Sequence, residues 1–204
     1  MKNLMKLVVS LMILVSVFFA APRARAQGPL LTGVGPRIEG SFGFEYIGQQ
    51  VPSASSVPMY GADVGLTVGI TRRFGVRGDV GYARAGNVFS SGHHSDILSY
   101  LAGPVYYPTR GHHLSTYIEA LAGGARVTGA TPVPSGGQVR GFANEFAWAG
   151  GAGMEIHTWP FLSLRIGGDY LHTQYFNPTA TLQGQGNLRA LVSFTYYIGG
   201  SKSR

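Results

Sequence analysis

The chain has 204 residues, of which 31 are glycine, none is cysteine and only 12% are charged. A soluble domain carries about a quarter of its residues as charged ones, so this composition disfavours an ordinary cytosolic enzyme. Hydrophobic residues make up 45% of the chain, which excludes a sequence too polar to bury a core. Because cysteine is absent, disulfides cannot stabilise the fold, and hydrogen bonding and packing must do so.

Residues 1–26 are predicted to be a secretory signal peptide. Two lysines precede the uncharged run 7–21, and the triplet Ala24-Arg25-Ala26 supplies a small-x-small cleavage site. The run is shorter than the ~20 apolar residues that a membrane-spanning helix requires. This segment holds four of the 16 basic residues and none of the nine acidic ones, so its removal lowers the net charge from +7 to +3. We therefore predict an exported protein without the basic cluster that nucleic acid binding requires.

After a short leader at 27–35, predicted to be periplasmic, apolar residues alternate with small or polar ones at the strand period of two. Eight segments show this pattern: 36–47, 60–70, 74–84, 96–107, 114–127, 139–156, 161–173 and 187–199. Long connections (48–59, 85–95, 128–138, 174–186) alternate strictly with short ones (71–73, 108–113, 157–160). An up-and-down meander places all long connections at one end, as bacterial outer-membrane barrels do with their extracellular loops. An even number of strands leaves both termini at the other, periplasmic end.

The sequence therefore predicts an all-β fold, an eight-stranded antiparallel up-and-down transmembrane β-barrel over residues 36–200. Residues 201–204 would form a periplasmic tail.

Charged residues gather on one face of the predicted strands. Eight of the nine acidic residues share the polar face by parity, and four arginines lie there with them. Charges inside a barrel need partners, so we predict an interior network of salt bridges. Its members are Arg37, Glu39, Glu45, Asp63, Arg77, Asp79, Glu119, Glu145, Glu155, Arg165, Asp169 and Arg189. The alternative is a narrow water path, which the excess of acidic groups would make cation-preferring.

Aromatic residues of the apolar face distinguish a membrane barrel from a soluble β-sandwich, whose aromatics would lie in mid-core. At the predicted loop end stand Tyr46, Tyr60, Tyr82, Phe142, Phe146 and Tyr170, and at the turn end Phe74, Tyr106, Trp159, Phe194 and Tyr196. Two such belts are what the two membrane interfaces select. They favour the membrane barrel.

Several stretches resemble a known group of proteins: 117–124, 146–153 with its Gly-Gly-Ala-Gly, 165–173, and the final strand from Arg189 to Tyr196. They are similar to the small eight-stranded outer-membrane barrels of the OmpA-like and opacity-like type. The resemblance covers about 36–200 and implies residence in the bacterial outer membrane. It also implies that the strand from Arg189 to Tyr196 is presented to the barrel-insertion machinery.

Three arginines at loop ends, Arg84, Arg126 and Arg140, share the parity of the apolar face. There they could contact the phosphates of lipopolysaccharide. The competing interpretation is three solvated loop residues.

Signals for catalysis and metal binding are weak. The pairs His93-His94 and His112-His113 fall at opposite ends of a strand and cannot share a metal ion. Ser90, Ser91, His93, His94 and Asp96 cluster around one loop, and Asp169 and His172 lie near another, without a nucleophile-elbow motif. We expect no cofactor, no metal and no enzymatic activity.

The predicted function is that of a monomeric, non-catalytic outer-membrane barrel that supports envelope integrity or limited permeation of small solutes. The alternative is surface adhesion or recognition through the four long loops. An enzyme that modifies outer-membrane lipids is the third and weakest hypothesis.

Overall fold

A computed structural model describes residues 37–50, 56–86, 94–132, 138–159, 161–176 and 182–199. The predicted signal at 1–26, the leader at 27–35 and the tail at 201–204 lie outside these residues. The strands are β1 (Arg37–Gln49), β2 (Val57–Gly69), β3 (Phe74–Ala85), β4 (Ser95–Arg110), β5 (Leu114–Pro132), β6 (Gln138–His157), β7 (Leu162–Phe176) and β8 (Leu182–Gly199). Within the described part of the chain, no helix is long and apolar enough to cross a membrane.

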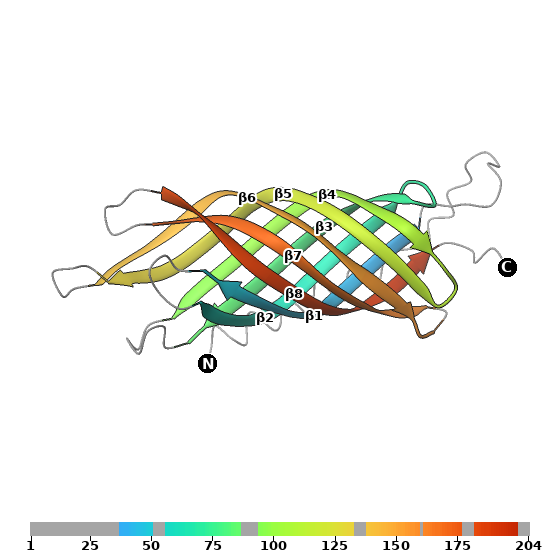
Figure 1. Cartoon of the computed structure of the whole chain (residues 1–204), viewed down its shortest axis with the longest axis horizontal. Coiled ribbons are helices and arrows are strands. Elements are labelled where there is room, and N and C mark those ends of the chain that lie inside the picture. The colour runs from blue at the N-terminus through green and yellow to red at the C-terminus, as the bar shows by residue number, and fades with distance from the viewer. Residues whose placement is uncertain are drawn as a thin grey trace. The chain divides into compact units, whose positions relative to one another are not determined.

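The strands form one closed sheet (Figure 1). Each strand pairs antiparallel with the next, and β1 pairs with β8 to close the barrel. The predicted eight-stranded antiparallel barrel is therefore confirmed. The connections at 50–56, 86–94, 133–137 and 177–181 define what we call the loop end, and those at 70–73, 111–113 and 158–161 define the turn end.

Two hairpins are longer than the sequence predicts. The pairing of β5 with β6 continues to Pro132 opposite Gln138, and that of β7 with β8 continues to Phe176 opposite Leu182. Much of the predicted long connections 128–138 and 174–186 is therefore strand. The apolar alternation ends before these extensions, whereas backbone ladder hydrogen bonds need no apolar side chains. Figure 1 shows both hairpins reaching beyond the ends of β1 to β4.

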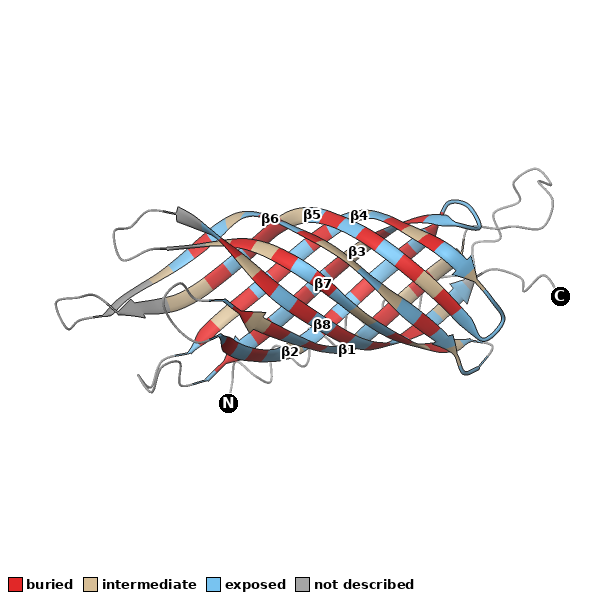
Figure 2. Cartoon of the chain, in the orientation of Figure 1, coloured by how far each residue is buried: buried red, intermediate tan, exposed pale blue. Residues whose placement is uncertain are grey.

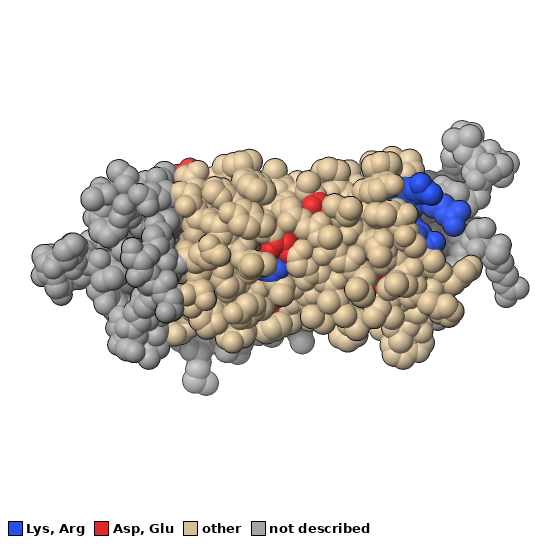
Figure 3. Space-filling view, viewed as in Figure 1, with Lys and Arg blue, Asp and Glu red and all other residues tan. Residues whose placement is uncertain are grey.

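The outer wall of the barrel is apolar. Burial alternates along the strands, with odd-numbered residues inside and even-numbered ones outside except near the end of β4 (Figure 2). Phe42 is 60% exposed, Phe194 is 58% exposed, and nine further aromatics of the predicted belts face outward; Tyr106 lies against Phe74. On the face drawn in Figure 3 most of the wall is uncharged, with a few acidic and basic atoms visible near its middle. So much exposed apolar surface fits lipid rather than water.

Glycine makes room for bulky side chains inside the barrel. Gly153 and Gly167 face inward, and a methyl group on either would collide with the ring of Tyr117. The Arg165 guanidinium stacks on that ring at 3.5 Å from its centroid. An eight-stranded barrel is only wide enough for side chains to fill, so a large pair must oppose residues without side chains.

The interior changes character from one end to the other. Hydroxyl, imidazole and aromatic groups line the turn end together with Glu39 and Arg110, and further charged groups line the middle. Toward the loop end, the inward residues include both the buried polar side chains Gln49, Ser95, Ser99, Thr173, Gln185 and Asn187 and an apolar cluster. The cluster consists of Ile47, Val57, Met59, Ala83, Ala85, Ile97, Leu101, Leu121, Ala125, Val127, Ala147, Ala149 and Leu171. The interior toward the loop end is therefore mixed, whereas the sequence predicts a polar one.

Candidate functional site

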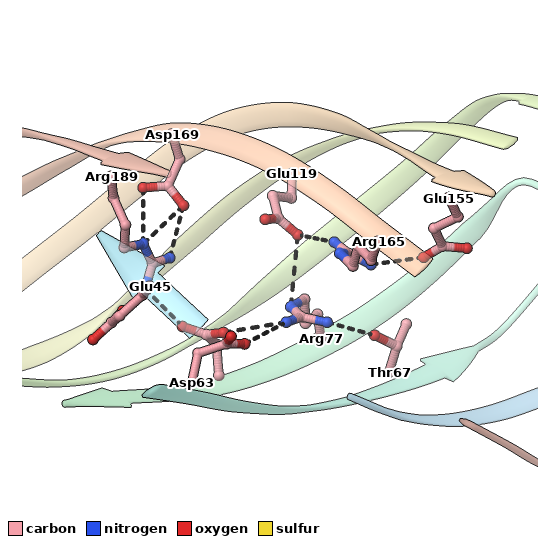
Figure 4. Close-up of polar contacts among 10 residues, drawn as sticks. Glu45, Asp63, Thr67, Arg77, Glu119, Glu155, Arg165, Asp169 and Arg189 are labelled. Carbon is pink, nitrogen blue, oxygen red and sulfur yellow. Dashed lines mark hydrogen bonds and ion pairs between the residues drawn. The ribbon is translucent and has the colours of Figure 1, made fainter. Parts of the chain in front are cut away.

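The charged interior is the candidate site, and three arginines organise it (Figure 4). Arg77 on β3, Arg165 on β7 and Arg189 on β8 are each at most 2% exposed. Their odd numbers place them inside the barrel. Each therefore requires carboxylate partners, because water does not reach it.

Arg189 connects strands on opposite sides of the barrel. Its Nε and Nη2 donate to Asp169 at 3.0 and 2.7 Å, and Nη1 donates to Asp79 Oδ1 at 2.9 Å. Asp169 lies opposite Arg189 in the β7–β8 pairing, whereas Asp79 comes from β3. This guanidinium thus ties β8 both to its neighbour and across the lumen.

Arg165 and Arg77 extend the network toward the turn end. Arg165 donates to Glu155 at 2.9 Å and to Glu119 at 2.7 Å. Arg77 donates to Asp79 at 3.2 Å, and its Nε lies 3.7 Å from Glu119. Because Glu119 and Asp79 are each shared between two arginines, all three guanidinium groups belong to one connected network.

A further arginine enters the interior at the turn end, and sequence parity missed it. The β4–β5 register shifts between Tyr106 and Thr109, which turns the even-numbered Arg110 inward. Its guanidinium lies 3.8 Å from the ring centroid of Tyr107, whose hydroxyl donates to Glu39 at 3.3 Å. Arg37 pairs with the same carboxylate, Nε to Oε1, at 2.6 Å.

A hydroxyl–imidazole cluster lines the turn end and was also missed. His157 Nε2 lies 2.8 Å from the Ser115 hydroxyl, and Nδ1 lies 2.7 Å from the Ser163 hydroxyl and 3.0 Å from the Tyr197 hydroxyl. These residues come from β5, β6, β7 and β8. The sequence places residue 157 in the short connection 157–160, whereas the structure continues β6 to His157, whose odd number matches its inward position.

Carboxylates outnumber buried arginines in this network. Glu39, Glu45, Asp63, Asp79, Glu119, Glu155 and Asp169 are buried. The oxygens of Glu45 and Asp63 accept no hydrogen bond from any described residue. Their nearest arginine nitrogens are 3.7 Å away on Arg189 and 3.6 Å away on Arg77. Glu145 is half-buried and has no ion pair within the described residues.

Outside the barrel, the loop-end arginines have protein partners of their own. Arg84 Nε lies 3.4 Å from Asp96, which also accepts a hydrogen bond from Tyr82 at 3.2 Å. The Arg126 guanidinium lies 4.7 Å from the ring centroid of Phe142. Arg84 and Arg126 stand on β3 and β5, on either side of β4. The side chain of Arg140 lies outside what the structure describes.

Of the weak catalytic signals, the described pair Asp169 and His172 points to opposite faces of the barrel wall. Asp169 points inward to Arg189, whereas His172 is even-numbered and stacks on Trp148 at a centroid distance of 5.6 Å. His94 lies 3.5 Å from Asp96, while Ser90, Ser91 and His93 fall outside the described residues. His112 and His113 occupy the turn after β4. The described residues contain no group of three or more His, Cys, Asp or Glu suited to a metal ion.

The network predicts a large loss of stability for one carboxylate substitution and a small change for another. Asp169→Asn removes a carboxylate that holds Arg189 by three hydrogen bonds, so we expect a loss of roughly 3 kcal/mol in unfolding free energy. Glu45→Gln replaces a carboxylate that accepts no hydrogen bond from a described residue, so we expect the unfolding free energy to change by at most about 1 kcal/mol. Denaturant titration of detergent-folded protein, followed by tryptophan fluorescence, measures both. Equal losses for the two variants would contradict the pairing described above.

Comparisons with known proteins agree with this architecture. Residues 11–195 match the model of the outer membrane protein beta-barrel domain. Among solved structures, Ail of Yersinia pestis is similar with a TM-score of 0.57 and 16% identity, covering 80% of this chain and 99% of that one. Neisserial surface protein A has a TM-score of 0.58 and 13% identity over 80% and 98% of the two chains. OprG of Pseudomonas aeruginosa has a TM-score of 0.52 and 11% identity over 82% and 98%.

These identities establish a shared fold rather than a shared activity. No curated protein matches the sequence. The family match, however, spans most of the chain and includes nearly every strand, and it places the protein in the bacterial outer membrane. The chain belongs to the outer membrane protein beta-barrel domain family.

Proposed function

We propose that this protein is a closed, non-catalytic structural barrel of the outer membrane that supports envelope integrity and permits little solute passage. Residues 1–26 serve as the export signal, the loop end faces the cell exterior, and both termini lie in the periplasm. The observation that carries this proposal is the filling of the barrel. Charged groups are tied to one another in the middle, and an apolar cluster lines part of the interior toward the loop end.

The apolar cluster opposes a continuous water path. Met59 on β2, Ile97 and Leu101 on β4 and Leu121 on β5 are buried side chains that offer no hydrogen bond to water. Hydrophobic constrictions of this kind exclude water and ions. A cation that entered the middle would also have to compete with three arginines for carboxylates. Permeation is therefore limited unless the cluster is opened.

Conductance in planar bilayers tests the closed barrel. We expect wild-type protein to give no resolved channel steps, because side chains fill the lumen. The double variant Leu101→Gly/Leu121→Gly should create a leak, and the excess carboxylates beneath should make it cation-preferring. Regular conductance steps from the wild type would contradict the proposal of a closed barrel. An anion-preferring leak in the double variant would contradict the expectation that the carboxylates set its ion selectivity.

The outer wall supports contact with lipopolysaccharide. Guanidinium groups bind phosphates through paired, charge-assisted hydrogen bonds. Arg126 has a ring contact with Phe142 but no ion pair within the described residues, so its donors remain available for a phosphate. Arg84 is engaged by Asp96 and is the weaker candidate. Arg140 stays a proposal from the sequence alone.

Thermal stability with and without lipopolysaccharide tests these contacts. We expect Arg126→Gln to lose most of the lipid-dependent increase in Tm and Arg84→Gln to lose less, because Asp96 already neutralises Arg84. Asn144→Ala, at the uncharged cross-strand neighbour of Arg126, serves as the control and should keep the full increase. An undiminished increase in the Arg126 variant would reject the contact.

The last strand supports a role in assembly. From Arg189 to Tyr196 its outward residues are Ala190, Val192, Phe194 and Tyr196, three of its four inward residues are polar and the fourth is Leu191, and it closes the barrel against β1. We propose that the barrel-insertion machinery recognises this strand and that the inserted protein is a monomer.

Surface recognition remains the second candidate function, and one observation favours it. The β5–β6 hairpin is paired as far as Pro132 opposite Gln138, beyond the ends of β1 to β4. A paired hairpin presents a more ordered surface than an unpaired loop. Ail, one of the similar structures, has been solved in complex with the heparin analogue sucrose octasulfate.

Binding to immobilised heparin tests that alternative. If the hairpin recognises sulfated saccharides, replacing residues 130–140 by Asn-Gly should abolish retention while leaving heat-modifiable migration on gels unchanged. Absence of wild-type retention, or equal retention after shortening, would reject recognition of this ligand by the hairpin.

A further inference from the structure

Two exposed arginines stand at the turn end of the barrel. Arg72 and Arg73 lie in the connection 70–73 between β2 and β3, and both are exposed. Basic residues gather at this end of the barrel in Figure 3. Neither guanidinium makes an ion pair or a ring contact with any described residue. They are cations without a counter-charge in the structured barrel.

The backbone beneath these arginines is fixed. The N–H groups of Ile70 and Thr71 both donate to the Phe74 carbonyl at 2.9 Å. The Thr71 hydroxyl accepts from the N–H of Arg73 at 3.3 Å and from that of Phe74 at 3.0 Å. Tyr107 N–H donates to the Arg73 carbonyl at 2.8 Å, which anchors the turn to β4. The turn therefore presents its two arginines from a preorganised scaffold.

Apolar and aromatic residues flank the pair. Ile70 is 69% exposed, and Phe74 packs on Tyr106 at a centroid distance of 4.7 Å on the outer wall. Exposed aromatic residues at strand ends mark the boundary between hydrocarbon and headgroups. Arg72 and Arg73 lie between Ile70 and Phe74 in the turn, which places them at the level of the headgroups.

The remaining described cations of this end are already engaged. Arg37 pairs with Glu39 and stacks on Tyr197, and Arg110 folds over Tyr107. The other two short connections, 111–113 and 158–161, contain no lysine or arginine. Free positive charge in the described part of this end is thus concentrated at one turn.

We propose that the turn 70–73 binds the phosphate of an anionic phospholipid headgroup in the leaflet that surrounds the turn end. Arginine suits this ligand because its planar fork of donors matches phosphate oxygens. The fixed turn lowers the entropy lost on binding. In the proposed orientation this is the periplasmic leaflet, so the site is separate from the lipopolysaccharide contact at the loop end. The proposed phosphate site rests on the part of the proposed function that places the barrel in a membrane, and not on the part that makes the barrel closed.

Photo-crosslinking in vesicles tests the site. The full chain is folded into phosphatidylcholine vesicles doped with phosphatidylglycerol that carries a photoactivatable headgroup, and cross-linked peptides are identified by mass spectrometry. We expect cross-links in residues 70–74 for the wild type. Each basic residue near an anionic surface contributes about a fivefold preference, so Arg72→Gln/Arg73→Gln should reduce the yield by up to roughly 25-fold. Arg84→Gln/Arg126→Gln, at the other end, should leave this cross-link unchanged.

Two further measurements make the result decisive. Photoactivatable phosphatidylcholine should give little cross-linking to the same peptide, since it carries no net negative charge. Rising salt should reduce the wild-type yield by screening, which tests the site even if the double variant fails to fold. Equal yields from both lipids, or yields that neither salt nor the substitutions change, would overturn the proposal. Failure of this site would leave the conductance and lipopolysaccharide results unaffected.

Discussion

Buried arginines paired with carboxylates are the constraint on which the rest of this structure depends. A closed sheet of eight strands leaves an interior only as wide as the side chains that fill it. Each inward guanidinium must therefore be matched by oxygens from other strands, and Arg189 is matched from β7 and from β3. The inward glycines follow from the same constraint. Gly153 and Gly167, for example, leave the space in which Tyr117 and Arg165 stack.

Much of this arrangement could be predicted from the sequence because a strand has a period of two. Parity alone placed Asp79, Asp169 and Arg189 inside, and the structure joins them. The same rule could not predict which carboxylate meets which arginine, because that depends on strand tilt and on distances across the lumen. It also gave no reason to separate Glu45, which accepts no hydrogen bond from a described residue, from Asp169, which accepts three.

The features that sequence reasoning missed have identifiable causes. The odd–even rule does not predict the inward position of Arg110, because a register shift in β4 reverses the alternation of inward and outward side chains at that point. His157 falls in the predicted connection 157–160, but it is the last residue of β6. The extended β5–β6 hairpin has strand pairing without apolar alternation, so the hydrophobic pattern did not reveal it. The apolar cluster near the loop end departs from the general expectation of a polar interior, and the inward parity of Ile97 and Leu101 is the signal that indicates it.

The central claim is that ion pairs across the lumen couple strands that are not neighbours in the sheet. A double-mutant cycle on Arg189 and Asp79, whose side chains meet at 2.9 Å, measures this coupling directly. The variants Arg189→Gln and Asp79→Asn, alone and together, are compared by denaturant unfolding in the same detergent. The structure predicts that the double variant is more stable than the sum of the single losses implies, by at least about 1 kcal/mol. Additive losses would contradict the paired interior.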